Sequence, residues 1–251
     1  MRLNDGTIGD LPQAVATFAY DRAGQAVGIV HFGIGAFHRA HQAWYTDAAM
    51  NGGDRDWMIL GVSLRSAAVA DQMNPQDGLY TVTKRSGEEW SSRLIGSVRE
   101  VLVPTTSAAR LAINLAAPRT QIISFTVTEK GYCRQADGSL DLALAGQGSF
   151  YPLLAQAFRD RRDAGIGGLT LLSCDNLADN GGQLRRLMTA YLAAEAPDLL
   201  DWFDTHCTCP SSMVDRIVPA TTEADRGPAG NGTARRWSNR SNPMKRRSCA
   251  C

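Results

Sequence analysis

Residues 27–47 read VGIVHFGIGAFHRAHQAWYTD, an apolar run followed by closely spaced glycines and histidines. Residues 27–32 are mostly apolar and β-branched, which is typical of a buried strand. Gly33 and Gly35 then interrupt the pattern, and helix-compatible residues follow them. The segment therefore predicts a strand, a glycine turn and a helix over about residues 37–50.

The glycine turn matches part of a dinucleotide-binding fingerprint. In G-x-G-x-x-G the glycines allow a tight turn and a close approach of the backbone to a pyrophosphate. Here His38 occupies the position of the third glycine. A plain turn between a strand and a helix explains the same residues, so the motif by itself leaves a cofactor site and a structural turn both open.

Strand and helix patterns alternate in the rest of the chain up to residue 206. Further strands are expected at residues 57–64, 120–132 and 167–174, and helices at 105–118, 150–165, 182–196 and 197–206. Residues 79–85 and 92–104 flank the turn-rich SGEEW and predict a hairpin. The alternation predicts an α/β fold with a largely parallel, doubly wound sheet, helices on both faces and an inserted β-hairpin. Ligands of such sheets bind outside the carboxyl ends of the strands, so the candidate binding segments are residues 33–39, 126–132 and 173–180.

The net charge of +1 conceals an asymmetry between the two ends of the chain. Residues 227–251 carry +6 and contain no acid, whereas residues 1–226 carry −5. A tail rich in Gly, Ser, Asn and Arg lacks the apolar surface that would offset the entropy of ordering it. We expect residues 1–226 to form the folded domain and residues 227–251 to be a disordered basic tail. Nucleic acid is not the expected partner of this tail, because its only aromatic residue is Trp237 and no recognition fold precedes it.

Compartment and metal content are also constrained by the sequence. The polar start MRLNDGTIGD and the absence of a long apolar run predict a cytoplasmic protein with no membrane partner and with reduced cysteines. No metal is expected, because the pair His38 and His41 lacks a third ligand. Cys207 and Cys209 beside His206 lack the usual spacing of zinc ligands.

Four segments together resemble the mannitol dehydrogenase family of polyol-specific dehydrogenases, which includes the fructuronate reductases (D-mannonate oxidoreductases). They are GIGAFHRAHQAWYTD, FTVTEKGY, LLSCDNLADNGG and SSMVDRIVPATT, in the family's order, within residues 27–226. The resemblance implies an NAD(P)-dependent, metal-independent enzyme acting on a small polyol or sugar acid. It also implies a Rossmann-type N-terminal domain, a helical C-terminal domain and an active site in the cleft between them.

The resemblance assigns roles to individual residues. The dinucleotide loop would comprise Gly33, Gly35, Ala36, Phe37, His38 and Arg39. Thr128, Glu129 and Lys130 would lie on the nicotinamide side of the cleft, and Asp215 near the substrate. Asn176 would hydrogen-bond the substrate oxygen that gains negative charge as hydride moves, because a developing alkoxide requires donors already aimed at it. Asn180 is expected to cap the next helix, a role open also to Asp175 and Asp179.

The choice of cofactor depends on the residues after the second strand. NAD-preferring Rossmann proteins place an acid there, which hydrogen-bonds the ribose 2′-hydroxyl. This chain has Gly61-Val62-Ser63-Leu64-Arg65 instead. NAD is the family's usual cofactor, but Arg65 and Ser63 could bind the 2′-phosphate of NADP; otherwise Arg65 is a surface residue.

The family's general base is a lysine in the pattern Lys-x4-Asn-x2-His, and none of Lys84, Lys130 and Lys245 matches it. We therefore expect the helical C-terminal domain to be absent and the chain to be weakly active or inactive. A frameshift near Gly227 would explain both this departure and the change in charge, and a functional binding arm is the alternative. Two functions stay open: an oxidoreductase transferring hydride between NAD(P) and C2 of mannitol/fructose or mannonate/fructuronate, and a dinucleotide-binding fragment without catalysis. The sequence does not specify the oligomeric state.

Overall fold

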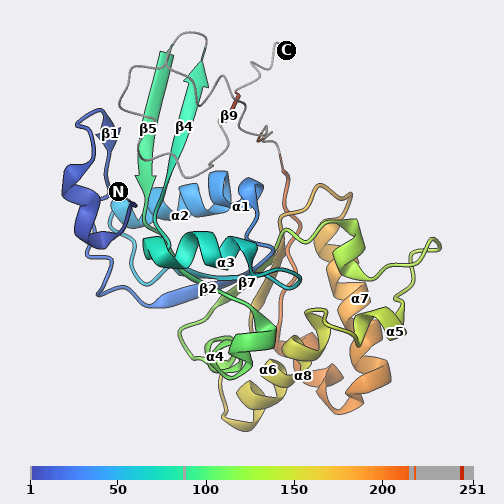
Figure 1. Cartoon of the computed structure of the whole chain (residues 1–251). Helices are drawn as coiled ribbons and strands as arrows, with labels where there is room; N and C mark the ends of the chain where they lie inside the picture. The colour runs from blue at the N-terminus through green and yellow to red at the C-terminus, as the bar shows by residue number, and fades with distance from the viewer. Residues whose placement is uncertain (1, 87–88, 215–217, 219–243, 246–251) are drawn as a thin grey trace.

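A five-stranded parallel sheet forms the centre of the computed structural model, which describes residues 2–86, 89–214, 218 and 244–245 (Figure 1). Its strand order is β6-β3-β2-β7-β8. The strands are β2 (Val27–Phe32), β3 (Met58–Val62), β6 (Val98–Leu102), β7 (Ile122–Phe125) and β8 (Thr170–Ser173). The strand order reverses between β2 and β7, which confirms the predicted doubly wound α/β fold and places the switch point directly after residues 27–32.

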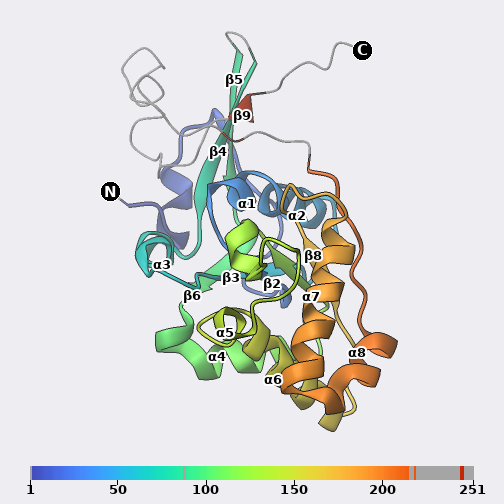
Figure 2. The same ribbon diagram turned by 90° about the vertical axis from the view of Figure 1, so that its right-hand side faces the viewer.

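Helices cover both faces of this sheet (Figure 2). One face carries α1 (Ala36–Ala40), α2 (Gln42–Asn51) and α3 (Ala68–Met73). The other carries α4 (Pro104–Ala116), α6 (Tyr151–Asp163), α7 (Asn180–Glu195) and α8 (Leu200–His206). The shorter elements are η1 (Asp5–Asp10), η2 (Asn74–Gln76), η3 (Glu129–Tyr132), α5 (Leu142–Ala145) and η4 (Pro197–Leu199). No helix among the described residues is both long enough and apolar enough to span a membrane.

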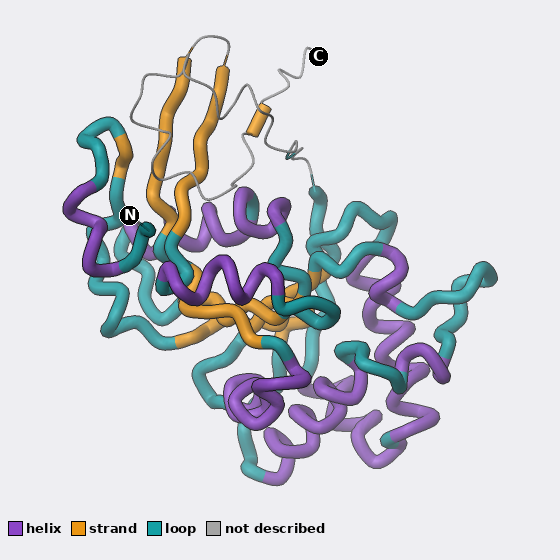
Figure 3. The backbone as a smooth tube through the Cα atoms, in the orientation of Figure 1, coloured by secondary structure: helices purple, strands orange, loops and turns teal. Residues whose placement is uncertain are grey.

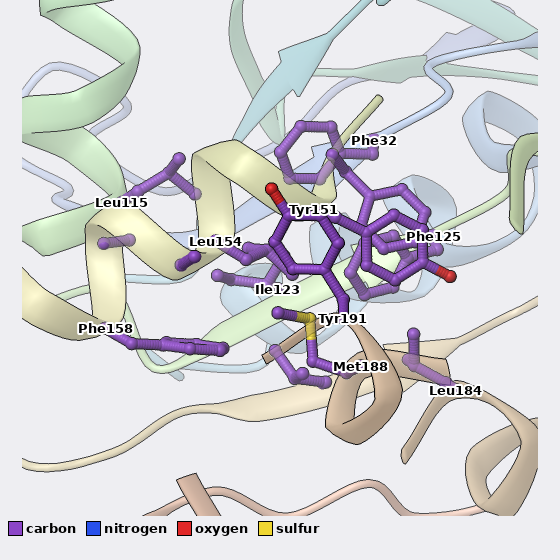
Figure 4. Packing of buried hydrophobic residues seen from close by; sticks show 14 of the residues in the cluster. Phe32, Leu115, Ile123, Phe125, Tyr151, Leu154, Phe158, Leu184, Met188 and Tyr191 are labelled. Carbon is purple, nitrogen blue, oxygen red and sulfur yellow. The ribbon is translucent and has the colours of Figure 1, made fainter. Parts of the chain in front are cut away.

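The central strand β2 is buried between two helical layers, and its residues are apolar apart from Gly28 and His31. Ile29 packs in the same cluster as Ala43 of α2, whereas Val30 and Phe32 pack with residues of α4, α6 and α7. Successive side chains of a strand point to opposite faces, so a strand between two helical layers needs no polar positions. On the second face the Phe32 and Phe125 rings lie 5.6 Å apart, and Figure 4 shows them beside Tyr151 and Tyr191.

The predicted hairpin exists, but its second arm is shorter than expected. β4 (Tyr80–Ser86) pairs antiparallel with β5 (Glu89–Ile95), and the pair rises from the main sheet near α1 and α2 (Figure 3). The expectation that residues 92–104 form one arm was wrong, because the chain leaves the hairpin at Gly96 and Ser97 and β6 joins the parallel sheet. The Phe18 ring lies 2.4 Å from where a Cβ on Gly96 would stand, and Ser97 Oγ donates to Ala43 O at 2.7 Å. The hydrogen bond from Ser97 fixes the point where the chain leaves the hairpin against α2.

One helix differs from the sequence prediction, and two short strands were not predicted. The helix expected at residues 37–50 is divided, because His41 (φ −115°, ψ −95°) separates α1 from α2. β1 (Val15–Ala16) and β9 (Met244–Lys245) add short parallel edges to the hairpin. Met244 and Lys245 of the expected tail thus lie on the edge of the small sheet; the other residues of 227–251 are outside the described part of the chain.

Asp47 of α2 fastens the hairpin to the main sheet. Its carboxylate is fully buried, and Oδ1 accepts hydrogen bonds from Tyr20 Oη at 2.6 Å and from Gly96 N at 2.9 Å. Oδ2 forms an ion pair with Arg93 Nη2 of β5 at 2.7 Å. The contacts join α2, the hairpin and the N-terminal segment in one network.

Replacing this carboxylate is expected to destabilise the chain strongly. Asp47→Ala leaves Arg93 and two donors without their buried partner, so urea denaturation should show a loss of about 3–5 kcal/mol in the free energy of unfolding. Asp198→Ala is the matched control, because it breaks an ion pair with Arg162 in which Asp198 is half exposed, a change expected to cost under about 1 kcal/mol. Similar losses in the two variants would contradict this role of Asp47.

Candidate functional site

Gly33 joins the ends of the two strands at the switch point. Its φ of +94° is a conformation that favours glycine, and a Cβ there would lie 2.2 Å from Thr126 O. Thr126 Oγ1 donates to Gly33 O at 2.7 Å, and Thr126 N donates to Phe32 O at 2.9 Å. The carboxyl ends of β2 and β7 therefore touch, and the fold itself accounts for the first glycine of the motif.

The loop between Gly33 and α1 leaves backbone donors available. Gly35 is exposed, and the nearest atom to a Cβ built on it is Gly33 O at 3.7 Å. The first helical hydrogen bond of α1 runs from Arg39 N to Gly35 O, so the amides of Ala36, Phe37 and His38 precede the helix's own bonds. Space and N–H donors thus coincide at Gly35.

Arg39 contributes to the shape of this loop. Its Nη1 donates to Ile34 O at 2.9 Å, and burial lowers the pKa of the guanidinium from its ordinary value. Tyr80 Oη donates to Arg39 O at 2.7 Å, which links the loop to the hairpin. Arg39, expected in the dinucleotide loop, therefore holds the shape of that loop through these two hydrogen bonds.

His38 lies in the core of the molecule. It is fully buried, and its ring stacks on His31 with centroids 3.4 Å apart. His31 is within hydrogen-bond distance of Ser124 Oγ (2.8 Å) and Thr126 Oγ1 (2.9 Å). The structure therefore gives the side chain at the third-glycine position a packing role, and only its backbone faces the loop.

The described residues do not bring metal-ligating side chains together. No group of three His, Cys, Asp or Glu side chains among them is placed to hold an ion. Cys133, Cys174, Cys207 and Cys209 are free thiols.

Asp175 clamps the ends of β7 and β8. Its carboxylate accepts hydrogen bonds from Val127 N (3.0 Å), Thr128 N (3.2 Å) and Tyr132 Oη (2.9 Å). Thr128 has φ +65° and ψ 166°, a strained conformation for a β-branched residue. The hydrogen bonds to Asp175 offset that strain. They also fix the backbone directly before Glu129 and Lys130, which are exposed. Sequence reasoning considered Asp175 only as a helix cap, although an acid directly after a buried strand and before Asn176 was a signal for it.

Asn176 and Asn180 have distinct environments. Asn176 is exposed and its side chain makes no hydrogen bond within the described chain, so its amide is available to a ligand. Asn180 was expected to cap α7, but this was wrong, because Asp179 is at the N-cap. The buried Asn180 Nδ2 instead donates to Asp175 O at 3.1 Å and to Ser212 O at 2.9 Å, and Asn180 Oδ1 accepts from Ser212 N. Asp215 lies outside the described residues.

Arg65 lies three residues after the carboxyl end of β3, the strand that pairs with β2. Phe32 pairs with Val62, so residues 63–65 continue next to the carboxyl end of β2. Ser63 Oγ donates to Ser66 O at 2.7 Å and is used by its own loop. Arg65 is exposed and has no hydrogen bond or ion pair to any residue described in the structure.

A family model described as the mannitol dehydrogenase Rossmann domain matches residues 27–234. The chain belongs to the mannitol dehydrogenase family. D-mannonate oxidoreductase of Escherichia coli strain K12 is 37% identical over 231 residues, which cover 86% of this chain and 48% of the relative. A polyol:NADP oxidoreductase of Gluconobacter oxydans is 35% identical over 232 residues, which cover 86% of this chain and 48% of the relative.

A solved structure shares the fold as well. Pseudomonas fluorescens mannitol 2-dehydrogenase, in a ternary complex with NAD and D-mannitol, matches with a TM-score of 0.87 at 37% identity. The match covers 98% of this chain and 53% of that one. The chain thus spans about half the length of these members of the mannitol dehydrogenase family, and the resemblance seen in the sequence is confirmed.

The stacked histidines predict sensitivity to acid. Burial lowers the pKa of His31 to about 3 and that of His38 well below its usual range, with nearby His31, Arg39 and His41 adding to the effect on His38. The unfolded chain takes up protons below about pH 6.5 while the folded chain does not, so stability falls as pH decreases from there.

His38→Phe should reduce this dependence. Each buried imidazole contributes a loss of about 1.4 kcal/mol per pH unit below pH 6.5, so urea denaturation at decreasing pH should give a shallower slope for the variant. The wild-type chain measured in the same buffers is the reference for the slope. A His38→Phe slope equal to that of the wild type would contradict the buried neutral pair.

Proposed function

We propose that this chain binds a nicotinamide dinucleotide across the carboxyl ends of β2, β7 and β8. The observation that carries the proposal is the open Gly35 position at the switch point, with the amides of Ala36, Phe37 and His38 beside it. Dinucleotides bind Rossmann sheets at this point, with the pyrophosphate against the first glycine turn. The residues fit the group, because the loop offers both unoccupied volume and N–H donors. Membership of a family whose matching domain is a Rossmann domain supports the same site.

We further propose that the whole protein is an oxidoreductase for a polyol or a sugar acid. When bound, the nicotinamide donates or accepts hydride at C2 of the substrate. The exposed Asn176 amide would donate a hydrogen bond to the substrate oxygen as it gains negative charge. Thr128 and Glu129 would border the nicotinamide, and Asp215 the substrate. Relatives named for mannonate and for polyols support this substrate class.

A second candidate function is dinucleotide binding without turnover. Of the lysines in the given sequence, none of Lys84, Lys130 and Lys245 matches the Lys-x4-Asn-x2-His pattern that the resemblance implies for the family's general base. Loss of a general base lowers a rate by roughly 10²–10⁴-fold. Isothermal titration with NADH and NADPH, followed by turnover assays with fructose and fructuronate, separates the two: binding without turnover supports the second function.

Gly35→Val tests the proposed binding site. The backbone there (φ −75°, ψ −176°) is extended and accepts any residue, so the variant should fold with nearly wild-type stability. Its side chain would fill the space where the pyrophosphate must approach, and NADH affinity should fall by at least about 100-fold. Gly33→Ala is the contrasting variant, expected to destabilise the fold because of the positive φ and the contact with Thr126 O. Retention of NADH affinity in a folded Gly35→Val chain would remove the loop from the site.

Arg65→Asp tests the preference between cofactors. We propose that Arg65 binds the 2′-phosphate of NADP, because it is exposed, unpaired within the described chain and follows the carboxyl end of β3, the neighbour of β2. Hydrogen bonds between charged groups contribute about 1.5–3 kcal/mol, so the variant should lower the ratio of NADPH to NADH affinity by about tenfold or more. Arg55→Asp, before β3 at the opposite end of that strand, makes the same change in net charge and should leave the ratio unaltered. An unchanged ratio in Arg65→Asp would exclude Arg65 from the site.

A further inference from the structure

The Asp175 carboxylate is a half-buried anion whose partners are all neutral. Its donors are two backbone amides, Val127 N and Thr128 N, and the phenol of Tyr132. No lysine or arginine of the described chain lies within ion-pair distance of it, whereas the buried carboxylate of Asp47 is paired with Arg93. Its negative charge is therefore held in place without being cancelled.

Burial raises the pKa of the Asp175 carboxyl from its ordinary value, while the hydrogen bonds from Tyr132, Val127 N and Thr128 N act in the opposite direction. Burial raises the pKa of the Cys174 thiol to about 12, and the adjacent Asp175 charge acts in the same direction. Burial also raises the pKa of the Tyr132 phenol, again with a contribution from Asp175. Tyr132 Oη is shared between Asp175 and Ser173 Oγ at 2.7 Å, so the hydrogen bonds orient the carboxylate while the field extends beyond them.

The position of Asp175 relates it to one half of the proposed cofactor. A Rossmann sheet consists of two mononucleotide-binding halves, and the dinucleotide crosses from one to the other at the switch point. β2, β3 and β6 form the half that contains Arg65, so β7 and β8 form the half that receives the nicotinamide. Asp175 lies two residues after the end of β8 and holds the segment after β7, whose Thr126 contacts Gly33. Asn176, the proposed donor to the substrate oxygen, is the next residue.

We propose that Asp175 is a positioning residue that fixes Thr128 and also stabilises the positive charge of the oxidised nicotinamide, favouring NAD⁺ over NADH. The inference rests on the proposed dinucleotide site. An oxidised nicotinamide ring carries a positive charge and a reduced ring does not, so only the oxidised form gains from a nearby fixed anion. The position of Thr128 affects the binding of NAD⁺ and of NADH alike. The positioning role and the charge role of Asp175 can therefore be separated by comparing the two affinities.

Binding of NAD⁺ and NADH to the 251-residue chain, measured by isothermal titration in one buffer, tests the inference. Asp175→Asn removes the charge and keeps the size of the side chain. We expect it to weaken NAD⁺ binding about fivefold more than NADH binding, the size of effect expected of one partly screened charge. Circular dichroism checks the fold, and Asp175→Ser provides a second neutral variant if the asparagine is not tolerated beside the two amides.

Tyr132→Phe is the matched control. It removes one donor from Asp175 but leaves the carboxylate charged, so it should change both affinities by the same factor and keep their ratio. Equal weakening of NAD⁺ and NADH in a folded neutral variant would overturn the charge assignment and leave Asp175 a purely structural clamp. Failure of the wild-type chain to bind either nucleotide would instead overturn the proposed function, so the two failures are distinguishable.

Discussion

The contact between Gly33 and Thr126 is the constraint on which the rest of the site depends. The backbones of β2 and β7 approach so closely that a Cβ on Gly33 would lie 2.2 Å from Thr126 O. Thr126 in turn hydrogen-bonds Gly33 O and lies within hydrogen-bond distance of His31, which supports the stacked His38 beneath the loop. Two residues further on, Thr128 is held by Asp175. One close approach thus places the ends of three neighbouring strands relative to one another.

The charges at this edge of the sheet are arranged differently from those elsewhere in the described chain. Asp47 and Arg93, which join α2 to the hairpin, neutralise each other in the interior. At the carboxyl ends of the strands, Arg65 has no anionic partner and Asp175 has no cationic one within the described residues. These two charges have opposite signs and lie on the two sides of the switch point. They suit a dinucleotide with an anionic 2′-phosphate on its adenosine and a cationic nicotinamide ring. This arrangement links the proposed choice between NADP and NAD to the proposed preference for the oxidised form.

Much of the fold follows from local patterns in the sequence. Apolar runs identified the regions of β2, β3, β7 and β8, and the alternation with helices predicted the parallel sheet. The errors occurred where tertiary contacts decide the outcome. Nothing local in residues 92–104 reveals that Phe18 packs against Gly96 and that Ser97 binds Ala43 O, so the end of the hairpin was missed.

The site shows the same division. The G-x-G pattern located the loop, because a glycine with positive φ is a local requirement. The clamp by Asp175 and the bonds from Asn180 to Ser212 join residues 32 or more positions apart, so composition and spacing could suggest only helix capping. The roles of Thr128, Glu129 and Asn176 rest on the family resemblance and stay predictions, as does that of Asp215, outside the described residues.

The central claim is that a dinucleotide lies across the carboxyl ends of β2, β7 and β8. The most direct test is an amide ¹H–¹⁵N correlation spectrum of the labelled chain recorded during titration with NADH. The account predicts shifts of the amides of Gly35, Ala36, Phe37 and residues 127–129, with those of α8 unchanged. Shifts confined to other parts of the sheet, or none at saturating NADH, would contradict it.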